Sequence, residues 1–409
     1  MNANDFFWRK VIAPLFVADA GGDAELRQIK QTFYYRTVLS RVFRNRPYAA
    51  PLEVHRIKKV LILRLDYSIG HTVIGSVMQK CLKELNPNLQ IHLLTATEAA
   101  PIVERDPRID KLFLYRRKQL PSLRLIASLR KEKYDAVFCL SFNSITVDGV
   151  MANLVAPRAV KIVRAHSDGW RNDLYRIFFN KQLETGGTAV PLWRQLVSIA
   201  EQTFGEKYPE ASIAQSLFLA PEREARLQHF LEANHIKAKA YTVLNLSVNP
   251  RSFSTSYRQW GYDNLKTFIT LFRKTFPVAP LIFSSLPADR LTAEQLLAET
   301  GDDKLLMLPP EFGLQETMAM IKYSASVVTP DTAIAHIAAT YQRPQVVLCA
   351  SEAFSNAWIP CSPLAVLLYG AGERGISQIT PPEVLNALEQ AASKETLLPQ
   401  LADVNHTGE

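Results

Sequence analysis

Residues 326–350 read SVVTPDTAIAHIAATYQRPQVVLCA, and this stretch decides the fold class of the chain. It begins with a short β-branched run that Pro330 ends, and it finishes with a second apolar run from Gln345 to Ala350. The segment between the two runs is long enough for one helix, so the sequence predicts a strand, a helix and a second strand. Units of this kind build parallel sheets that helices cover.

The helix predicted between these strands begins at Thr332, whose hydroxyl can cap it. The backbone N–H groups of Ala333 and its neighbours then point outward at the positive end of the helix dipole, which is a typical phosphate site. His336 follows Thr332 by four residues and shares its helix face. An ordinary capped helix with a satisfied histidine has the same pattern, so a functional interpretation needs support from other segments.

Composition limits the class of protein. The chain has 409 residues, 47% of them hydrophobic, which is enough for two cores. Its four cysteines form no CxxC pair and are expected to be reduced thiols, as in a cytoplasmic protein. No run approaches the roughly 18 apolar residues that span a bilayer, and acidic Asp5 stands where a signal peptide has its apolar core. We therefore expect a chain that is neither secreted nor transmembrane.

The formal charge of +8 predicts an acidic partner, such as a phosphorylated substrate, an anionic membrane or nucleic acid. Basic residues alternate with apolar ones between Glu25 and Tyr48, which is typical of an amphipathic helix on anionic headgroups. A helix packed on its domain, with a solvated charged face, explains the pattern equally well. No nucleic-acid-binding motif accompanies it, so nucleic acid is not expected as a partner. The basic residues are Arg27, Lys30, Arg36, Arg41, Arg44 and Arg46.

The order of apolar runs predicts four parts of the chain. Residues 1–57 form a basic helical N-terminal extension, and residues 58–220 alternate strands with helices as a first Rossmann-like domain. Residues 221–380 repeat the pattern as a second domain, and residues 381–409 form a C-terminal helix and tail that could cross back to the first. The fold class is therefore α/β, with two doubly wound sheets. Since ligands bind beyond the carboxyl ends of such strands, we expect the site in a cleft between the domains.

The segment RLDYSIGHTVIG, residues 64–75, directly follows the first predicted strand. Gly70 suits a tight turn from strand to helix, and Asp66 and His71 flank it. Either side chain could act as a general base there. No lysine follows Gly75 as in a phosphate-binding P-loop, and no GxGxxG follows the first strand of either domain. A nucleoside triphosphatase and a Rossmann oxidoreductase are therefore disfavoured.

A polar loop, NLSVNPRSFSTSYRQWG, follows the first strand of the second domain at residues 245–261. It contains Ser254, Thr255 and Arg258, whose hydroxyl and guanidinium groups are good donors to a pyrophosphate. A flexible surface loop would have the same composition.

Together these three segments resemble glycosyltransferase family 9, the heptosyltransferases of lipopolysaccharide core assembly. The family has an Asp-Thr/Ser-Gly segment followed by His, alanines and Pro, and this chain matches it with Asp331, Thr332, His336 and Pro344. Ala333 stands in place of the Gly. The resemblance implies a GT-B fold and a nucleotide-sugar donor whose phosphates bind Thr332 and the following amides, while Asp331 faces the donor sugar.

Two more segments of the second domain match the family. Arg258-Gln259-Trp260-Gly261 is similar to a Lys-x-Trp-Pro element, which implies that Arg258 binds the donor phosphates. The segment LPPEFGL at residues 308–314 resembles a family element that contacts adenine through its backbone, which implies roles for Glu311 and Phe312.

The first-domain segment departs from the family pattern. The family shows Arg-Leu, three residues, then Gly-Asp, whose Asp is the proposed base. This chain has Arg64-Leu65, four residues, then Gly70-His71. His71 could take over the role because an imidazole titrates near neutral pH, or Asp66 could approach from the other side of the turn. A different acceptor or a loss of transfer activity is the third alternative.

The resemblance implies an inverting, metal-independent glycosyltransferase that transfers heptose from a nucleotide sugar, expected to be ADP-heptose, to a lipopolysaccharide core or related bacterial glycan. A catalytically silent GT-B glycan-binding or assembly protein is the alternative. Arg116, Arg117 and Lys118, after a strand of the first domain, could bind an anionic acceptor, although a solvated turn fits as well. We expect no cofactor, and a cytoplasmic protein that lies on the inner face of the membrane if the N-terminal helix binds lipid.

Overall fold

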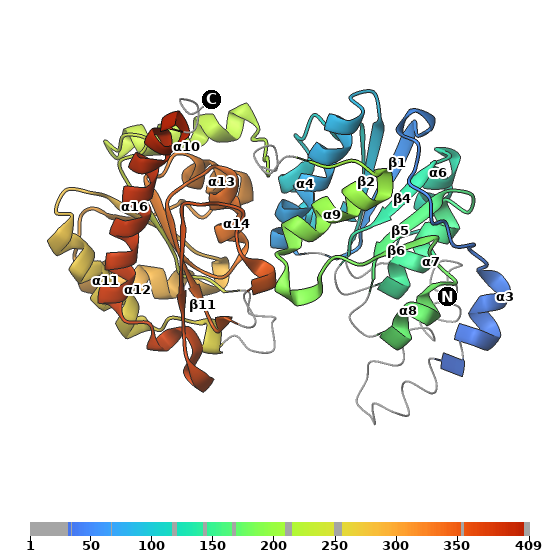
Figure 1. Ribbon diagram of the computed structural model, residues 1–409. Coiled ribbons are helices and arrows are strands. Elements are labelled where there is room, and N and C mark those ends of the chain that lie inside the picture. Colours follow the sequence, from blue (N-terminus) through green and yellow to red (C-terminus); the bar gives the residue numbers. More distant parts are fainter. Residues whose placement is uncertain are drawn as a thin grey trace, which may run out of the picture. The chain divides into compact units, whose positions relative to one another are not determined.

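The computed structural model describes residues 32–33, 35–66, 68–116, 121–141, 145–165, 169–208, 215–248, 256–352 and 356–404. The chain divides into two compact domains (Figure 1). The first contains Met1–Gly187 and Arg194–Ile213, and the second contains Thr188–Trp193 and Ala214–Glu409. The second domain therefore includes the C-terminal segment from residue 381.

The first domain is built on a six-stranded parallel sheet of order β3-β2-β1-β4-β5-β6. Its central strands are almost fully buried because helices cover both faces: α4 and α9 lie on one side, and α6 and α7 on the other (Figure 1). The strands are β1 (Lys59–Arg64), β2 (Gln90–Ala96), β3 (Lys111–Tyr115), β4 (Ala136–Cys139), β5 (Val160–Arg164) and β6 (Lys181–Leu183). The helices are α4 (Ile69–Leu85), α5 (Ala100–Val103), α6 (Leu123–Lys131), α7 (Ile145–Val155), α8 (Gly169–Tyr175) and α9 (Leu192–Phe204).

The second domain repeats this plan with a parallel sheet of order β12-β11-β10-β7-β8-β9. Helices α11, α12 and α16 pack together on one face, and α10, α13 and α14 on the other. The strands are β7 (Thr242–Asn245), β8 (Leu281–Ser284), β9 (Leu305–Met307), β10 (Ser326–Pro330), β11 (Gln345–Cys349) and β12 (Ala365–Tyr369). The helices are α10 (Pro221–Ala233), α11 (Tyr262–Thr275), α12 (Arg290–Thr300), α13 (Leu314–Lys322), α14 (Ala333–Thr340) and α16 (Pro381–Val404).

The predicted fold class, two doubly wound Rossmann-like domains of the GT-B kind, is confirmed. Helix α16 packs against α11 and strands β10 to β12 of its own domain. Val384, Ala387 and Leu388 bury its apolar face there. The sequence did not predict β6, which has only three residues, two of them polar, or α10, which is rich in charged side chains.

The described part of the N-terminal extension contains a π-helical turn, η4 (Tyr35–Leu39), and one turn of α-helix, α3 (Ser40–Val42). The helix predicted to reach Tyr48 ends at Val42, because the backbone beyond it bonds to the first domain instead. The Tyr48 and Leu52 amides donate to the carbonyls of Asn180 (2.9 Å) and Thr203 (2.7 Å). Tyr35 and Leu39 join the core of that domain, so one face of the segment is packed on protein.

All four cysteines are free thiols, as expected. In the part of the chain that the structure describes, no helix combines the length and apolarity that crossing a membrane requires.

Candidate active site

Both candidate bases of the first domain lie at the carboxyl end of β1. Asp66 follows the strand, and Ser68 caps α4 by accepting a hydrogen bond from the His71 backbone N–H at 3.4 Å. The cap brings the imidazole over the strand end, where His71 Nδ1 lies 2.9 Å from Asp66 Oδ2. The structure thus joins the two residues that the sequence left as alternatives into one hydrogen-bonded pair.

Arg64 supports this pair from inside the domain. Its side chain is only 1% exposed, and Nη2 lies 3.4 Å from Asp66 Oδ2. Helix α4 passes close to the guanidinium at Gly75, where a Cβ would come within 2.6 Å of Arg64 Nη1. Gly75 therefore gives the guanidinium room to reach Asp66, and a buried cation requires such an anionic partner. The sequence indicated only that Gly75 is not part of a P-loop.

A second carboxyl group, Asp148 of α7, was missed by the sequence reasoning. It is completely buried and accepts hydrogen bonds from Ser141 Oγ (2.8 Å) and from the Ser141 backbone N–H (3.2 Å). Ser141 Oγ also accepts from the Leu65 backbone N–H at 2.8 Å, which ties Asp148 to the end of β1. Burial is the main cause that raises the pKa of Asp148 to about 8; the negative charge of Asp66 acts in the same direction, and the Ser141 hydrogen bonds oppose the shift. In the sequence, the signal for this buried group is a single carboxylate, Asp148, within an otherwise largely apolar helix.

In the second domain, the predicted helix cap at Thr332 is confirmed. Thr332 has an extended backbone, and its Oγ1 accepts a hydrogen bond from the Ile334 N–H at 3.4 Å. Asn245, at the end of β7, donates from Nδ2 to Thr332 Oγ1 (3.2 Å) and to Thr329 Oγ1 (3.0 Å). Ala333 is the first residue of α14 and has no positive φ, so the glycine of the family pattern is not required by the backbone here.

Arg258 lies at the same edge of the second sheet as this cap. It ends a short 3₁₀ turn, η9 (Ser256–Arg258), and its Nη2 donates to the Asp331 carbonyl oxygen. Burial raises the pKa of Asp331 to about 6, while the guanidinium charge opposes that shift. The two predicted donor residues are therefore in direct contact. Ser254 and Thr255 lie outside the described residues.

The remaining donor candidates lie farther from the cap. His336 is 3% exposed within α14, so its imidazole is almost fully enclosed by protein. Glu311 is exposed, whereas the Phe312 ring packs on Phe230 (6.0 Å between centroids) and under the Arg226 guanidinium (4.8 Å). The Phe312 side chain thus anchors its loop to α10, and the Phe312 backbone N–H donates to the Pro309 carbonyl at 3.0 Å within the loop.

Among the acceptor candidates, Arg116 directly follows β3 and is exposed. Arg117 and Lys118 lie outside the described residues.

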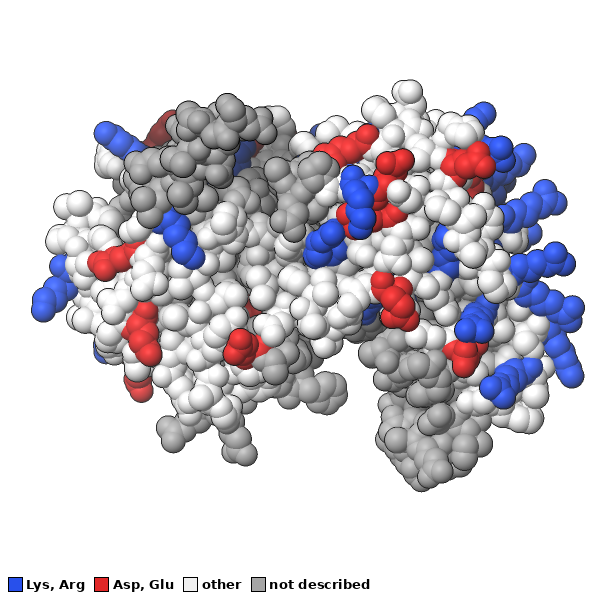
Figure 2. All heavy atoms as spheres, viewed as in Figure 1, with Lys and Arg blue, Asp and Glu red and all other residues white. Residues whose placement is uncertain are grey.

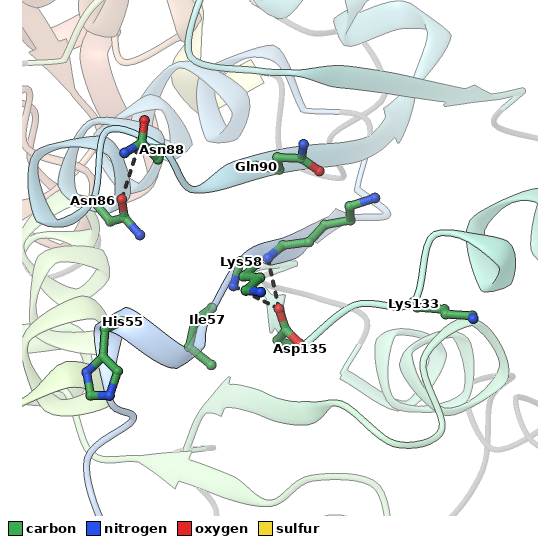
Figure 3. Close-up of a pocket in the computed structure, with 9 residues that line it drawn as sticks. His55, Ile57, Lys58, Asn86, Asn88, Gln90, Lys133 and Asp135 are labelled. Atoms are coloured by element: carbon green, nitrogen blue, oxygen red, sulfur yellow. Dashed lines mark hydrogen bonds between the residues drawn. The ribbon is translucent and has the colours of Figure 1, made fainter.

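Two hollows differ in their relation to the strand ends. One, of about 240 Å³, lies at the carboxyl ends of β7, β10 and β11 and is lined in part by Asn245, Trp260 and Pro330. The other, of about 510 Å³, lies at the amino ends of β1, β2 and β4 (Figure 3). In it the Asp135 carboxylate accepts from the Lys58 N–H at 2.8 Å and so ties strand starts together. Only the first hollow is at the ligand-binding edge of a parallel sheet.

The raised pKa of Asp148 predicts that stability depends on pH. The folded state holds this proton up to about pH 8, whereas an unfolded Asp releases it near its ordinary value of 3.8. The free energy of unfolding therefore falls as pH rises between these values, at about 1.4 kcal/mol per pH unit. Asp148→Asn cannot ionise and should melt above the wild type at about pH 8, with the difference shrinking toward about pH 5.

Thermal melts across this pH range measure the effect. Asp173→Asn, which neutralises an exposed carboxylate of the same domain, is the matched control and should follow the wild type. Parallel pH curves for wild type and Asp148→Asn would show that Asp148 is ionised in the folded state.

Comparison with known proteins agrees with this geometry. The model of glycosyltransferase family 9 (heptosyltransferase) matches residues 122–358. Similar solved structures include Escherichia coli ADP-heptose lipopolysaccharide heptosyltransferase II, with 16% identity over 83% of this chain and 99% of that one and a TM-score of 0.65. E. coli heptosyltransferase WaaC with ADP-2-deoxy-2-fluoro heptose has 17% identity over 81% and 99%, with a TM-score of 0.63.

A family 9 glycosyltransferase from Veillonella parvula DSM 2008 has 16% identity over 85% of this chain and 100% of that one, with a TM-score of 0.69. No curated protein matches the chain by sequence. Identities this low show a shared fold, whereas the family match spans more than half of the 409 residues. The chain belongs to glycosyltransferase family 9, the heptosyltransferase family.

Proposed function

We propose that the chain is an inverting glycosyltransferase that transfers heptose from ADP-heptose to a lipopolysaccharide core or a related bacterial glycan. The observation that carries this proposal is the capped N-terminus of α14 with Arg258 bonded beside it, within the span of the family match. A guanidinium and helix-terminal amides suit a diphosphate. The WaaC structures contain ADP or an ADP-heptose analogue, so ADP-heptose is the first donor to test.

His71 is the proposed base, and Asp66 orients it. The Asp66 carboxylate at Nδ1 favours the tautomer with hydrogen on Nδ1, so Nε2 carries the lone pair that would take the proton of the acceptor hydroxyl. The acceptor oxygen then bonds to the anomeric carbon as the bond from that carbon to the phosphate oxygen breaks. The bonding pair leaves with ADP, and the configuration inverts. Asp66 stabilises the imidazolium that forms.

The second domain would stabilise the leaving group. Negative charge grows on the ADP phosphate as the bond breaks, and Arg258, Thr332 and the dipole of α14 oppose it. Because these groups supply positive charge, the proposed mechanism needs no metal. Asp331 would face the donor sugar. Ser254 and Thr255 would also bind the donor phosphate, as would the start of the helix that contains Ala333 and His336. The backbone of Glu311 and Phe312 would contact adenine. Arg116, Arg117 and Lys118 would bind the acceptor.

A catalytically silent glycan-binding or assembly protein is the second candidate. The absence of the family's Asp after Gly70 favours it, since His71 occupies that place. Both candidate functions predict that the chain binds the donor, but only the glycosyltransferase predicts transfer of the sugar.

We also propose that the N-terminal segment binds an anionic membrane surface. Arg36, Arg41, Arg44 and Arg46 are exposed, and Phe33 and Val42 are 68% and 67% exposed. Figure 2 shows Lys and Arg side chains gathered along the edge of the first domain where α3 and α6 lie. Exposed apolar side chains within a basic surface suit anionic headgroups. The packing of Tyr35 and Leu39 fixes this surface to the domain.

Incubation of the purified protein with ADP-heptose and a truncated core acceptor should release ADP and extend the glycan. The rate should be unchanged by EDTA, because Arg258 and the helix amides take the place of a metal. Mass spectrometry of the glycan and an ADP assay measure the reaction. Tight ADP-heptose binding without turnover would favour the silent protein, and no binding would contradict both candidates.

Substitution of the proposed base should slow the transfer reaction without weakening the binding of the donor. His71→Ala is expected to lower kcat by about 10²-fold or more, because it removes the proton acceptor. Asp66→Asn keeps an acceptor for Nδ1 but loses the charge, so its loss of kcat should be smaller. His229→Ala, at an exposed histidine, is the control. An unchanged kcat for His71→Ala would exclude His71 as the base.

Charge reversal tests the membrane proposal. Arg41→Glu combined with Arg44→Glu should weaken cosedimentation with phosphatidylglycerol vesicles by about tenfold or more, since each basic side chain near such a surface contributes about 1 kcal/mol. Lys237→Glu with Lys274→Glu makes the same change of net charge at exposed sites of the other domain and should bind as the wild type does. Equal losses in both double variants would mean that only net charge matters, with no dedicated surface.

A further inference from the structure

The loop between β12 and α16, residues 370–379, packs directly on the turn that carries Arg258. It contains a 3₁₀ segment, η12 (Gly372–Gln378), which Gly375 interrupts with φ 55° and ψ −133°. Only glycine adopts this conformation readily. Since η12 and η9 are in contact, the shape of one constrains the other.

Gly375 is the point of closest approach. A Cβ there would fall on the Tyr257 carbonyl group, 2.7 Å from its carbon and 2.8 Å from the Tyr257 Cβ. On the other side of the loop, a Cβ at Gly370 would fall on the Gly375 carbonyl and lie 2.9 Å from the Ile376 nitrogen. Three stretches of backbone are thus stacked without intervening side chains, and the last of them ends at Arg258.

The loop is itself held firmly by the core of the domain. Ile376 and Ile379 are 1% and 4% exposed and belong to that core. Trp260 Nε1 donates to the Ile379 carbonyl at 2.8 Å, and Asn264 Nδ2 donates to the carbonyls of Ser377 and Trp260, each at 2.9 Å. These bonds join the loop to the residues that directly follow the Arg258 turn, while Gly375 packs on the turn itself, so the turn is braced before any ligand binds.

We propose that Gly375 is a positioning residue for donor binding, which acts by setting the place of the Tyr257 backbone and hence of Arg258. This inference rests on the proposed contact between Arg258 and the donor diphosphate. An arginine side chain loses much rotamer entropy when a ligand orders it, so a fixed backbone and a fixed partner at the Asp331 carbonyl lower the cost of ordering Arg258. The brace lies after the family match, which ends at residue 358.

The loop provides a matched pair of substitutions. Gly375→Ala adds a methyl group onto Tyr257, whereas Gly372→Ala adds one at φ 60° with nothing within 4 Å. Both carry the strain of a positive φ, and only Gly375→Ala places its methyl group on the Arg258 turn. Calorimetric titration with ADP should give a Kd about tenfold or more higher for Gly375→Ala, and within about twofold of the wild type for Gly372→Ala. Equal affinities in the two variants would overturn the inference.

A double-mutant cycle tests whether Gly375→Ala weakens ADP binding by displacing Arg258 or by disturbing the fold of the domain in general. Arg258→Gln should weaken ADP binding strongly in the wild type, but little further in the Gly375→Ala background, because the displaced guanidinium no longer contributes. Additive losses would show that Gly375 does not act through Arg258. If Arg258→Gln alone leaves the Kd for ADP unchanged, the proposed function of Arg258 fails, whatever Gly375 does.

A milder variant covers the case in which Gly375→Ala does not fold. Asn264→Ala removes the bonds to the Ser377 and Trp260 carbonyls and leaves the backbone stack intact. It should raise the Kd for ADP in the same direction by a smaller factor, with less than additive coupling to Arg258→Gln. Unchanged ADP affinity in a folded Asn264→Ala protein would count against the brace.

Discussion

The parallel pairing of β10 with β7 on one side and β11 on the other is the constraint on which the donor edge of the second domain depends. In this register Val328 lies opposite Leu244, so the next residues, Thr329 and Asn245, meet at the carboxyl end of the sheet. The Asn245 amide then bonds to both Thr329 and Thr332. Strand pairing therefore fixes where α14 begins, and the direction of its dipole follows.

The family's pattern departs from this chain at two places, and the physical consequences differ. Ala333 replaces a glycine, but the residue is helical, and alanine is about 1 kcal/mol better than glycine in a helix. The first-domain departure changes chemistry, because His71 replaces an acidic residue in a turn that is one residue longer. Asp66 supplies a carboxylate to that turn from the strand side, and the imidazole contacts it.

Local patterns in the sequence predicted the strands and the cap well. The strand predicted to begin at Gln345 is β11, Gln345–Cys349, because a continuous apolar run there directly follows Pro344. Thr332 was predicted as a cap from its residue type before an apolar helix. Both signals lie within a few neighbouring residues, which is why a sequence alone can carry them.

Contacts made by tertiary packing could not be predicted in the same way. The approach of Gly75 to Arg64 depends on how closely α4 lies against β1, and the bond from Ser141 to Asp148 depends on the angle of α7. The end of the N-terminal helix at Val42 was missed because its backbone partners, such as Asn180, are more than a hundred residues away. Hydrophobic periodicity contains no information on such distances.

The buried groups beneath His71 form a balanced set of charges. Arg64 brings one positive charge, and Asp66 and Asp148 could bring two negative ones, yet only Asp66 is beside the imidazole. Because burial raises the pKa of Asp148 to about 8, Asp148 is protonated at neutral pH, and Arg64 and Asp66 form a neutral pair. A second ionised carboxylate would give this buried set a net negative charge, which burial opposes. The apolar surroundings of Asp148 in α7 therefore leave Asp66 as the charged carboxylate that orients His71 in the proposed mechanism.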